Sequence, residues 1–270
     1  MVASRRSTSH IERVRSSFSR QARDFDAAGL TLGRQELLDW ITAALPLTPM
    51  ARALDVAAGT CHLSRAVAPR VRSVAAVDVT PAMLREARAE IADAQTGNLH
   101  LVQADAGRLP FPDQHFDLVM CRLAIHHFAD PAVEVAEMAR VARESGTLAI
   151  VDLLSPDDGS LAERYNAFER MRDPSHTRAL TARELLALLT TAGRPVSSWT
   201  VREVEVELDS WFELTRTPAS ARRTVAGALA LELDGGPSTG MRPRQRAGRL
   251  SFVHTWGLVQ AGPLGRSVHA

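Results

Sequence analysis

The period of hydrophobic and polar positions changes several times along the chain, and each period predicts a different element. Residues 10–25 place apolar side chains at spacings of three and four, which is typical of an amphipathic helix. Residues 34–45 keep that period and predict a second helix, which ends before Pro46. We therefore expect residues 1–48 to form an N-terminal helical cover or arm.

Between residues 52 and 154, short apolar runs alternate with helical periods. Thr80 before Pro81, and Asp130 before Pro131, are typical N-cap and first-turn pairs of helices. The predicted strands are 52–57, 72–79, 98–103, 116–121 and 147–154, and the predicted helices are 62–69, 81–94 and one that begins at Pro131. Apolar strands separated by helices predict a parallel sheet with helices on both faces.

The C-terminal part of the chain mixes both periods. Thr181 and Glu184 have the spacing of a capping box, which predicts a helix start. The elements predicted here are helices 161–172 and 182–192, strands 201–209 and 250–261, and helical pieces with a Gly- and Pro-rich loop over 210–249. The alternating strand 201–209 should expose one face to solvent.

Composition and charge exclude several classes of protein. Hydrophobic residues make up 45% of the 270 positions and charged residues 23%, which is ordinary for a soluble globular protein. A net charge of +1 gives no overall attraction to nucleic acid or to a membrane surface. Two cysteines are too few for a disulfide scaffold and favour a reducing cytosol. We expect a cytoplasmic protein with free thiols and no metal site.

The first loop of the predicted sheet is the first candidate for chemistry. The segment LDVAAGTCHL (54–63) leads from an apolar strand through small residues into a helix, and ligands of open α/β sheets bind at such loops. A three-glycine turn would have glycine at 57, 59 and 61, but only Gly59 is present, between Ala57 and Cys61. Asp78 ends the next strand, where an acid can bind ribose hydroxyls. Together these features indicate an adenosine-type ligand.

Five motifs in a fixed order carry a family resemblance. They are LDVAAGT, VDVTPAML, QADAGRLPFPDQHFDLV, IHHF and GTLAIVD. In this order and spacing, over about residues 50–154, the chain resembles the class I S-adenosylmethionine-dependent methyltransferases, in the group that contains the ubiquinone and menaquinone C-methyltransferases. The resemblance implies a Rossmann-like, seven-stranded, mostly parallel sheet with an antiparallel last strand. It also implies S-adenosylmethionine as cofactor and a small-molecule substrate.

The resemblance implies a cofactor-binding role for each matching residue. The methionine end of the cofactor would meet Asp55, Ala57, Gly59, Thr60 and Cys61, with backbone groups of Cys121 and Arg122. The ribose and adenine would meet Asp78, Val79, Met83, Asp105 and Ala106. Family members usually have glycine where Cys61 stands. Its side chain therefore either crowds the cofactor or packs into the following helix, and we favour packing because a thiol is most often a buried hydrophobe.

Histidines are the candidates for a general base, because imidazole titrates near neutral pH. His126 and His127 follow the fourth predicted strand, and adjacent residues on an extended segment point opposite ways, so at most one should face the substrate. His176, in RDPSH, is a further candidate. SFSRQARDF (17–25) echoes the family as well, which assigns Phe18, Gln21 and Phe25 to the substrate or the cover.

The expected organisation is an arm over 1–48 and a methyltransferase domain over 49–270, with 156–195 and 210–249 on the substrate side. The helix 10–25 would cover the cofactor or act as an exchanged arm in a homo-oligomer. We expect C- or O-methylation of a small, largely apolar metabolite, in line with secondary metabolism.

Two alternatives remain open at this point. One is a methyltransferase-fold protein that binds or cyclises its ligand without methyl transfer, and the other is a nucleic-acid methyltransferase. A nicotinamide-dependent reductase is disfavoured, because the chain has no lysine and its one tyrosine, Tyr165, is followed four positions later by Glu169.

Overall fold

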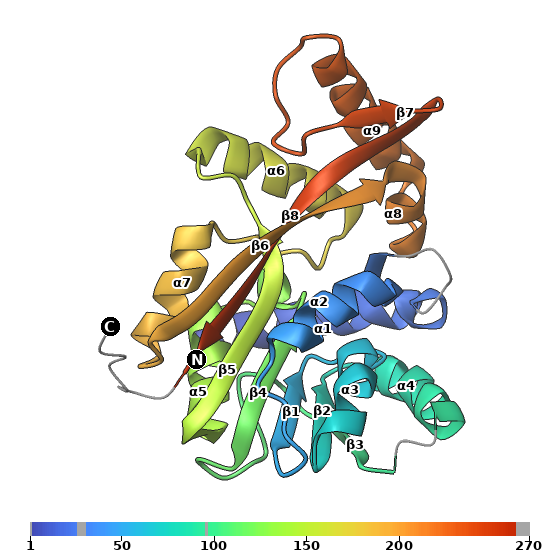
Figure 1. Ribbon diagram of the computed structural model, residues 1–270. Helices are drawn as coiled ribbons and strands as arrows, with labels where there is room; N and C mark the ends of the chain where they lie inside the picture. The colour runs from blue at the N-terminus through green and yellow to red at the C-terminus, as the bar shows by residue number, and fades with distance from the viewer. Residues whose placement is uncertain (1, 26–30, 95–96, 263–270) are drawn as a thin grey trace.

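A twisted sheet runs through the whole molecule (Figure 1). The computed structural model describes residues 2–25, 31–94 and 97–262. The strands are β1 (Arg52–Val56), β2 (Ser73–Asp78), β3 (Leu99–Gln103), β4 (Phe116–Arg122), β5 (Ala142–Leu154), β6 (Val196–Glu207), β7 (Arg244–Arg246) and β8 (Arg249–Ala261). Their order is β3-β2-β1-β4-β5-β8-β6, with β7 paired to β8. Strands β1 to β5 are parallel, and β8 is antiparallel to both of its long neighbours.

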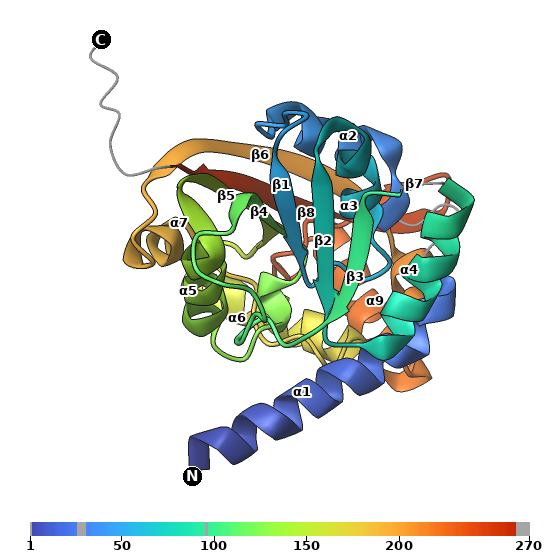
Figure 2. The same cartoon turned by 90° about the horizontal axis from the view of Figure 1, so that it is seen from below.

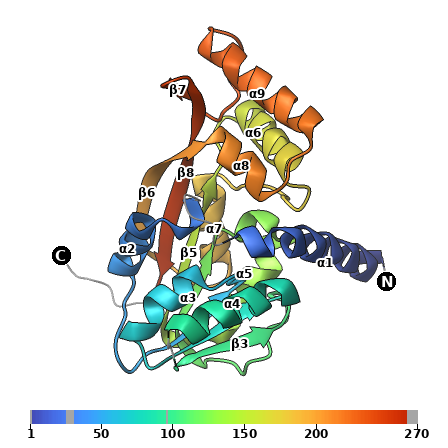
Figure 3. The same ribbon diagram turned by 90° about the vertical axis from the view of Figure 1, so that its right-hand side faces the viewer.

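Helices cover both faces of this sheet (Figures 1 and 3). The helices of the described residues are α1 (Val2–Gln21), α2 (Gln35–Ala44), α3 (His62–Val67), α4 (Pro81–Ala94), α5 (Pro131–Val141), α6 (Gly159–Arg172), α7 (Ala182–Thr191), α8 (Leu208–Leu214) and α9 (Ala219–Leu233). Leu37 of α2 and Leu63 of α3 belong to one buried core, while Met138 of α5 and Leu185 of α7 belong to a second. Among the described residues, no helix is both long and apolar enough to span a bilayer.

The elements predicted from the sequence are confirmed, with differences at their ends. Asp130 accepts a hydrogen bond from Ala132 N–H at the start of α5, and Thr181 forms the expected capping box with Glu184. Strand β6 begins at Val196 rather than 201, because it pairs with β8 along nearly its whole length. Helix α1 begins at Val2 rather than at residue 10.

Strand β7 is an eighth strand that the sequence pattern did not predict. It consists of three exposed residues, RQR, and therefore has no apolar period. It forms because Ala247 and Gly248 both have positive φ, at 50° and 76°, and such a two-residue turn folds a hairpin back onto β8.

Several elements gather beyond the carboxyl ends of the parallel strands. Helices α6, α8 and α9 and the β7 hairpin lie there, at the top of Figure 1. Helix α1 crosses the same region below them (Figure 2). This arrangement encloses the edge of the sheet where ligands of open α/β folds bind.

Candidate functional site

The loop between β1 and α3 contains three left-handed residues within five positions. Ala57, Gly59 and Cys61 have φ values of 56°, 56° and 68°. Glycine adopts this conformation freely, whereas any other residue there costs about 1–2 kcal/mol. The chain therefore keeps the backbone of a three-glycine turn while it carries side chains at two of the three positions.

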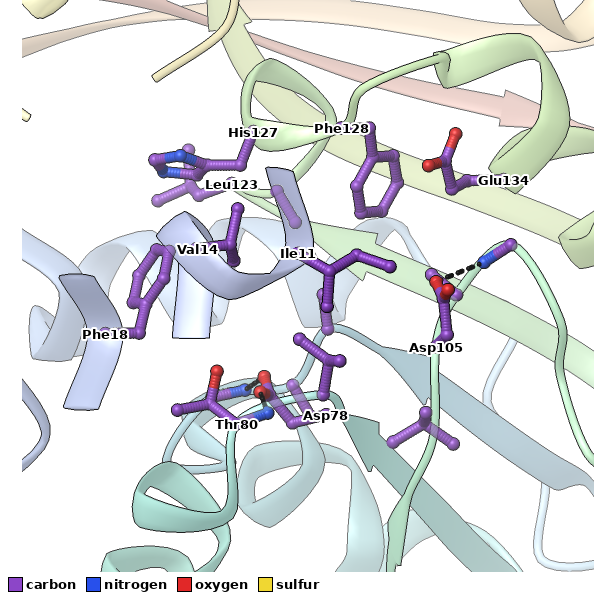
Figure 4. A pocket seen from close by; sticks show the side chains of 18 of the residues that line it. Ile11, Val14, Phe18, Asp78, Thr80, Asp105, Leu123, His127, Phe128 and Glu134 are labelled. Carbon is purple, nitrogen blue, oxygen red and sulfur yellow. Dashed lines mark hydrogen bonds between the residues drawn. The ribbon is translucent and has the colours of Figure 1, made fainter. Parts of the chain in front are cut away.

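A cavity of about 720 Å³ opens beside this loop (Figure 4). It lies at the carboxyl ends of β1 to β4. Strand β1 has β2 on one side and β4 on the other, so the strand order reverses here, and ligands of open α/β sheets bind at such a point. Its wall contains eight of the residues to which the sequence assigned cofactor contacts, namely Asp55, Ala57, Gly59, Asp78, Val79, Asp105, Ala106 and Arg122.

Asp78 ties the loop to the end of β2. Its Oδ2 accepts a hydrogen bond from the Gly59 N–H at 2.9 Å, and its Oδ1 accepts one from the Thr80 N–H at 2.7 Å. Burial raises the pKa of this carboxyl, and these backbone bonds oppose the rise. Because a carboxylate oxygen accepts more than one hydrogen bond, Asp78 can still bind hydroxyl groups in the cavity.

Asp55 and Arg122 place opposite charges at the end of the cavity formed by β1 and β4. Asp55 is buried and accepts a hydrogen bond from the Ser64 hydroxyl at 2.5 Å. Burial raises the pKa of Asp55 to about 6, although Ser64 and Arg122 oppose this. Burial also lowers the pKa of Arg122 to about 10, against the attraction of Asp55. This end of the cavity can therefore bind a group that carries both an amine and a carboxylate.

Two carboxyl groups lie at the other end of the cavity. Figure 4 shows Asp105 and Glu134 there, beside Phe128. Asp105 Oδ1 accepts a hydrogen bond from the Gly107 N–H at 2.9 Å. Burial raises the pKa of Glu134 to about 7, and Asp105 adds to the rise. No sequence pattern singled out Glu134, because an acid in the first turn of a helix has an ordinary role in complementing the helix dipole.

Helix α1 forms the roof of the cavity. Ile11, Val14 and Phe18 point into it (Figure 4). His10 holds the roof in place, since its Nε2–H donates to the His127 carbonyl oxygen at 2.7 Å. The apolar period of residues 10–25 is therefore used for covering a cavity as well as for packing.

The end of α1 is bound to the segment that follows α6. The Ser17 hydroxyl donates to Asp173 Oδ1 at 2.9 Å, and Gln21 Nε2 donates to Asp173 Oδ2 at 3.2 Å. Asp173 and Ser17 are both buried. Helix α1 of the predicted cover therefore contacts a segment of the predicted substrate side through buried hydrogen bonds. No sequence pattern indicated these bonds.

A second cavity, of about 450 Å³, adjoins the first. Its apolar wall consists of Phe18, Phe25, Leu123, Leu153, Val206, Trp211, Leu214 and Trp256. Its charged lining residues are Arg34, Arg172, Asp173, Glu205 and Glu207. Phe18, Phe25, Leu123 and His127 line both cavities, so the two spaces share one wall.

The three candidate histidines are brought together, but only two reach a cavity. The ring centres of His126 and His127 are 4.2 Å apart, and His176 lies 5.4 Å from His126. His126 lines the second cavity and His127 lines both, whereas His176 lines neither. The expectation that adjacent His126 and His127 point opposite ways was wrong, because Ile125–His127 is a 3-10 helix and not an extended segment. His176 Nε2 instead pairs with the Asn166 side-chain oxygen at 2.8 Å.

Four of the residues expected to contact the cofactor lie behind the cavity wall. Thr60, Cys61, Met83 and Cys121 are buried and are absent from the lining. Both thiols are free, and burial raises the pKa of each well above its usual range. Cys61 belongs to the core packed under α3, and this placement favours packing over crowding of a ligand. A cofactor contact by these four residues stays a prediction.

Similar proteins were found by family model and by sequence. A family model described as a methyltransferase domain matches residues 54–150. A Bacillus subtilis methyltransferase, YcgJ, is 34% identical over 177 residues, which are 64% of this chain and 69% of YcgJ. A demethylmenaquinone methyltransferase of a Parafrankia species is 32% identical over 189 residues, which are 63% of this chain and 74% of that protein.

Solved structures share the same fold. The crystal structure of YcgJ superimposes with a TM-score of 0.77 at 28% identity, and the match covers 85% of this chain and 99% of YcgJ. The cyclase SpnF superimposes with a TM-score of 0.62 at 18% identity, covering 85% of this chain and 81% of SpnF. At that identity the likeness to SpnF shows the fold alone.

Proposed function

This chain belongs to the class I S-adenosylmethionine-dependent methyltransferases, and we propose that it methylates a small, largely apolar metabolite. The observation that carries the proposal is the pair of adjoining cavities. One is large enough for a nucleoside cofactor and is lined by the family's motif residues. The other is smaller, and aromatic and aliphatic side chains are the most numerous group in its wall.

We assign the cofactor to the larger cavity because its polar groups match the parts of S-adenosylmethionine. Asp78 has carboxylate oxygens available for the ribose hydroxyls, and Asp105 for the adenine amine. Asp55 and Arg122 would hold the amino-acid end, and Ala57 and Gly59 would let it approach the loop. When bound, the cofactor supplies an electrophilic methyl group on a sulfonium ion.

The metabolite would occupy the smaller cavity, with its reacting atom at the wall that both cavities share. Phe18, Phe25 and Leu123 exclude water from that wall, and His127 adds a polar edge. Transfer of a methyl group needs the nucleophile in line with the breaking bond, so the chain contributes mainly by fixing two ligands in contact. The apolar lining supports an aromatic or aliphatic metabolite, in keeping with secondary metabolism.

These assignments give each segment of the chain a role. The N-terminal part, 1–48, supplies the cover through α1, and 49–270 forms the methyltransferase domain, while 156–195 and 210–249 contribute to the substrate side. From 156–195, Arg172 and Asp173 line the smaller cavity, and from 210–249, Trp211 lines it. We propose a cytoplasmic enzyme for which no nucleic-acid partner is needed, and in which α1 serves its own chain.

Calorimetry with S-adenosylmethionine and S-adenosylhomocysteine tests the proposal. We expect both to bind with 1:1 stoichiometry, while NAD, as a control dinucleotide, gives no heat. A cell extract supplied with cofactor carrying a ¹³C-labelled methyl group should then yield a labelled small molecule. Absence of heat with both cofactor forms at millimolar concentration would overturn the assignment of the cavity, and label found only in nucleic acid would overturn the substrate class.

A further inference from the structure

His126 is the one candidate histidine whose ring is bonded to a buried carboxylate. It lies in the short 3-10 helix Ile125–His127, directly after β4. Its ring Nδ1 is hydrogen-bonded to Asp152 Oδ1, and its backbone N–H donates to Asp152 Oδ2 at 3.3 Å. Asp152 is buried near the end of β5, where it also accepts from the Leu153 N–H at 2.6 Å. The carboxylate therefore holds the imidazole with its proton on Nδ1.

The same residue lines the smaller cavity. With the proton on Nδ1, Nε2 carries a lone pair. Among the described residues, no hydrogen bond to His126 Nε2 is formed, and His126 lines the smaller cavity. Its neighbour His127 lies on the wall between the two cavities, and the centres of the two imidazole rings are 4.2 Å apart. An acceptor atom at that wall would thus lie next to a basic nitrogen oriented by a carboxylate.

We propose that the metabolite is methylated on a hydroxyl oxygen and that His126, positioned by Asp152, is the general base. This rests on the methyltransferase function proposed above and chooses among carbon, nitrogen and oxygen acceptors. The hydroxyl proton moves to His126 Nε2. The oxygen forms its bond to the methyl carbon while the bond between that carbon and sulfur breaks, and its electron pair stays on sulfur. The imidazolium then returns its proton to solvent.

The charges around His126 favour this role over one for its neighbour. Burial alone would lower the pKa of His126, but the Asp152 carboxylate and Glu169 raise it, so the net shift is upward. His127 differs, because burial and the proximity of His126 lower its pKa to about 4. His127 donates from Nδ1 to Ser175 Oγ, 3.2 Å away, since that hydroxyl already donates its hydrogen to Asp173.

Arg172 favours an oxygen nucleophile over an amine. It lines the smaller cavity, its guanidinium lies 5.2 Å from the centre of the Trp211 ring, and it opposes protonation of His126. Its Nε donates to the Trp211 carbonyl oxygen at 3.2 Å, and its other two nitrogens make no hydrogen bond to a described residue. A cation in this position stabilises a developing oxyanion and repels an ammonium group. His176, the remaining group near His126, is neutral because burial lowers its pKa.

The position of the transferred methyl group is the direct test. The protein is incubated with S-adenosylmethionine carrying a ¹³C-labelled methyl group and with a small-molecule extract of the cells that carry the gene. The carbon chemical shift of the product separates methyl bound to oxygen, nitrogen and carbon. A methyl ether supports the proposal, and a C- or N-methyl product overturns it while leaving the methyltransferase function intact. No labelled product at all would overturn both.

Variants then test the base itself on the product found. His126→Asn keeps a donor toward Asp152 but removes Nε2, so we expect kcat to fall by about 100- to 10,000-fold. Binding of S-adenosylhomocysteine should not change, because His126 lines only the smaller cavity. His100→Asn, the same change at an exposed histidine of β3, is the matched control and should keep full activity.

The pH profile separates a base from a structural residue. The wild-type kcat should rise with pH as His126 loses its proton, with an apparent pKa above the usual value of imidazole because Asp152 raises it. Asp152→Asn removes that charge, so the rise should move to lower pH while the maximal rate falls. A profile that stays unchanged in Asp152→Asn, or a His126→Asn variant with wild-type kcat, would overturn the assignment.

Discussion

At the scale of single residues, Asp78 combines a structural and a binding role. Its two oxygens accept backbone hydrogen bonds from Gly59 and Thr80 and also face the larger cavity. We predict that Asp78→Ala weakens binding of S-adenosylhomocysteine by roughly 1–3 kcal/mol, because ribose hydroxyls lose a charged acceptor. Calorimetry measures the change, and a denaturation curve checks that the variant is folded. An unchanged dissociation constant in the folded variant would show that Asp78 does not bind the ribose.

At Cys61 the backbone conformation favours glycine, whereas the packing of the side chain favours a larger residue. Its φ of 68° favours glycine, but its side chain is fully buried in the core. We predict that Cys61→Gly leaves stability within about 1 kcal/mol, because relief of left-handed strain offsets about 1–2 kcal/mol of lost packing. Cofactor affinity should not change, because Cys61 does not line the cavity.

Alanine separates the two effects at this position. Cys61→Ala also loses the sulfur but keeps the strain, so it should be less stable than Cys61→Gly by about 1 kcal/mol. Urea denaturation of both variants gives these differences, and calorimetry gives the affinity. If Cys61→Gly bound S-adenosylhomocysteine tenfold more tightly at unchanged stability, the side chain would have to lean toward the cofactor.

At the scale of elements, α1 is the part whose removal is most informative. The two large cores contain no residue before Leu37, whereas Phe18 and Phe25 form part of the wall between the cavities. We predict that a chain beginning at Thr31 stays folded but loses methyl transfer. Circular dichroism and activity measure these outcomes, and size-exclusion chromatography tests whether the arm also holds an oligomer together.

A matched control removes a different contact between the N-terminal segment and the rest of the chain. Arg216 forms an exposed ion pair with Asp24, 3.0 Å away, which joins the N-terminal segment to the region after α8. Exposed pairs contribute little to stability, so Arg216→Ala should keep activity. If the truncated chain methylated as fast as the full chain, α1 would have no part in either cavity.

At the scale of the whole molecule, the sheet joins two halves that border different cavities. Its parallel half, β1 to β5, ends in the loops around the larger cavity. The long antiparallel pair β6 and β8 continues past those ends and carries α8 against it (Figure 1). The smaller cavity takes Val206 from one of these strands and Trp256 from the other, so the extension of the sheet builds part of its wall.

Much of the fold and part of the site follow from the sequence. Regular alternation of apolar strands with helical periods is a local property, so it predicted the parallel sheet and its order of elements. Motif residues such as Asp78 and Asp105 stand at strand ends, and parallel strands bring their carboxyl ends to one edge. Their positions in the sequence are therefore enough to group them at one site.

The tertiary structure alone decided the rest, because these features depend on contacts between distant segments. The bond between His126 and Asp152 spans 26 positions and the one between Ser17 and Asp173 spans 156, and neither has a local pattern. The orientation of Cys61 likewise depends on its burial against the core. A sequence determines which residues stand at a strand end, whereas the direction of a side chain depends on the space that the folded chain leaves for it.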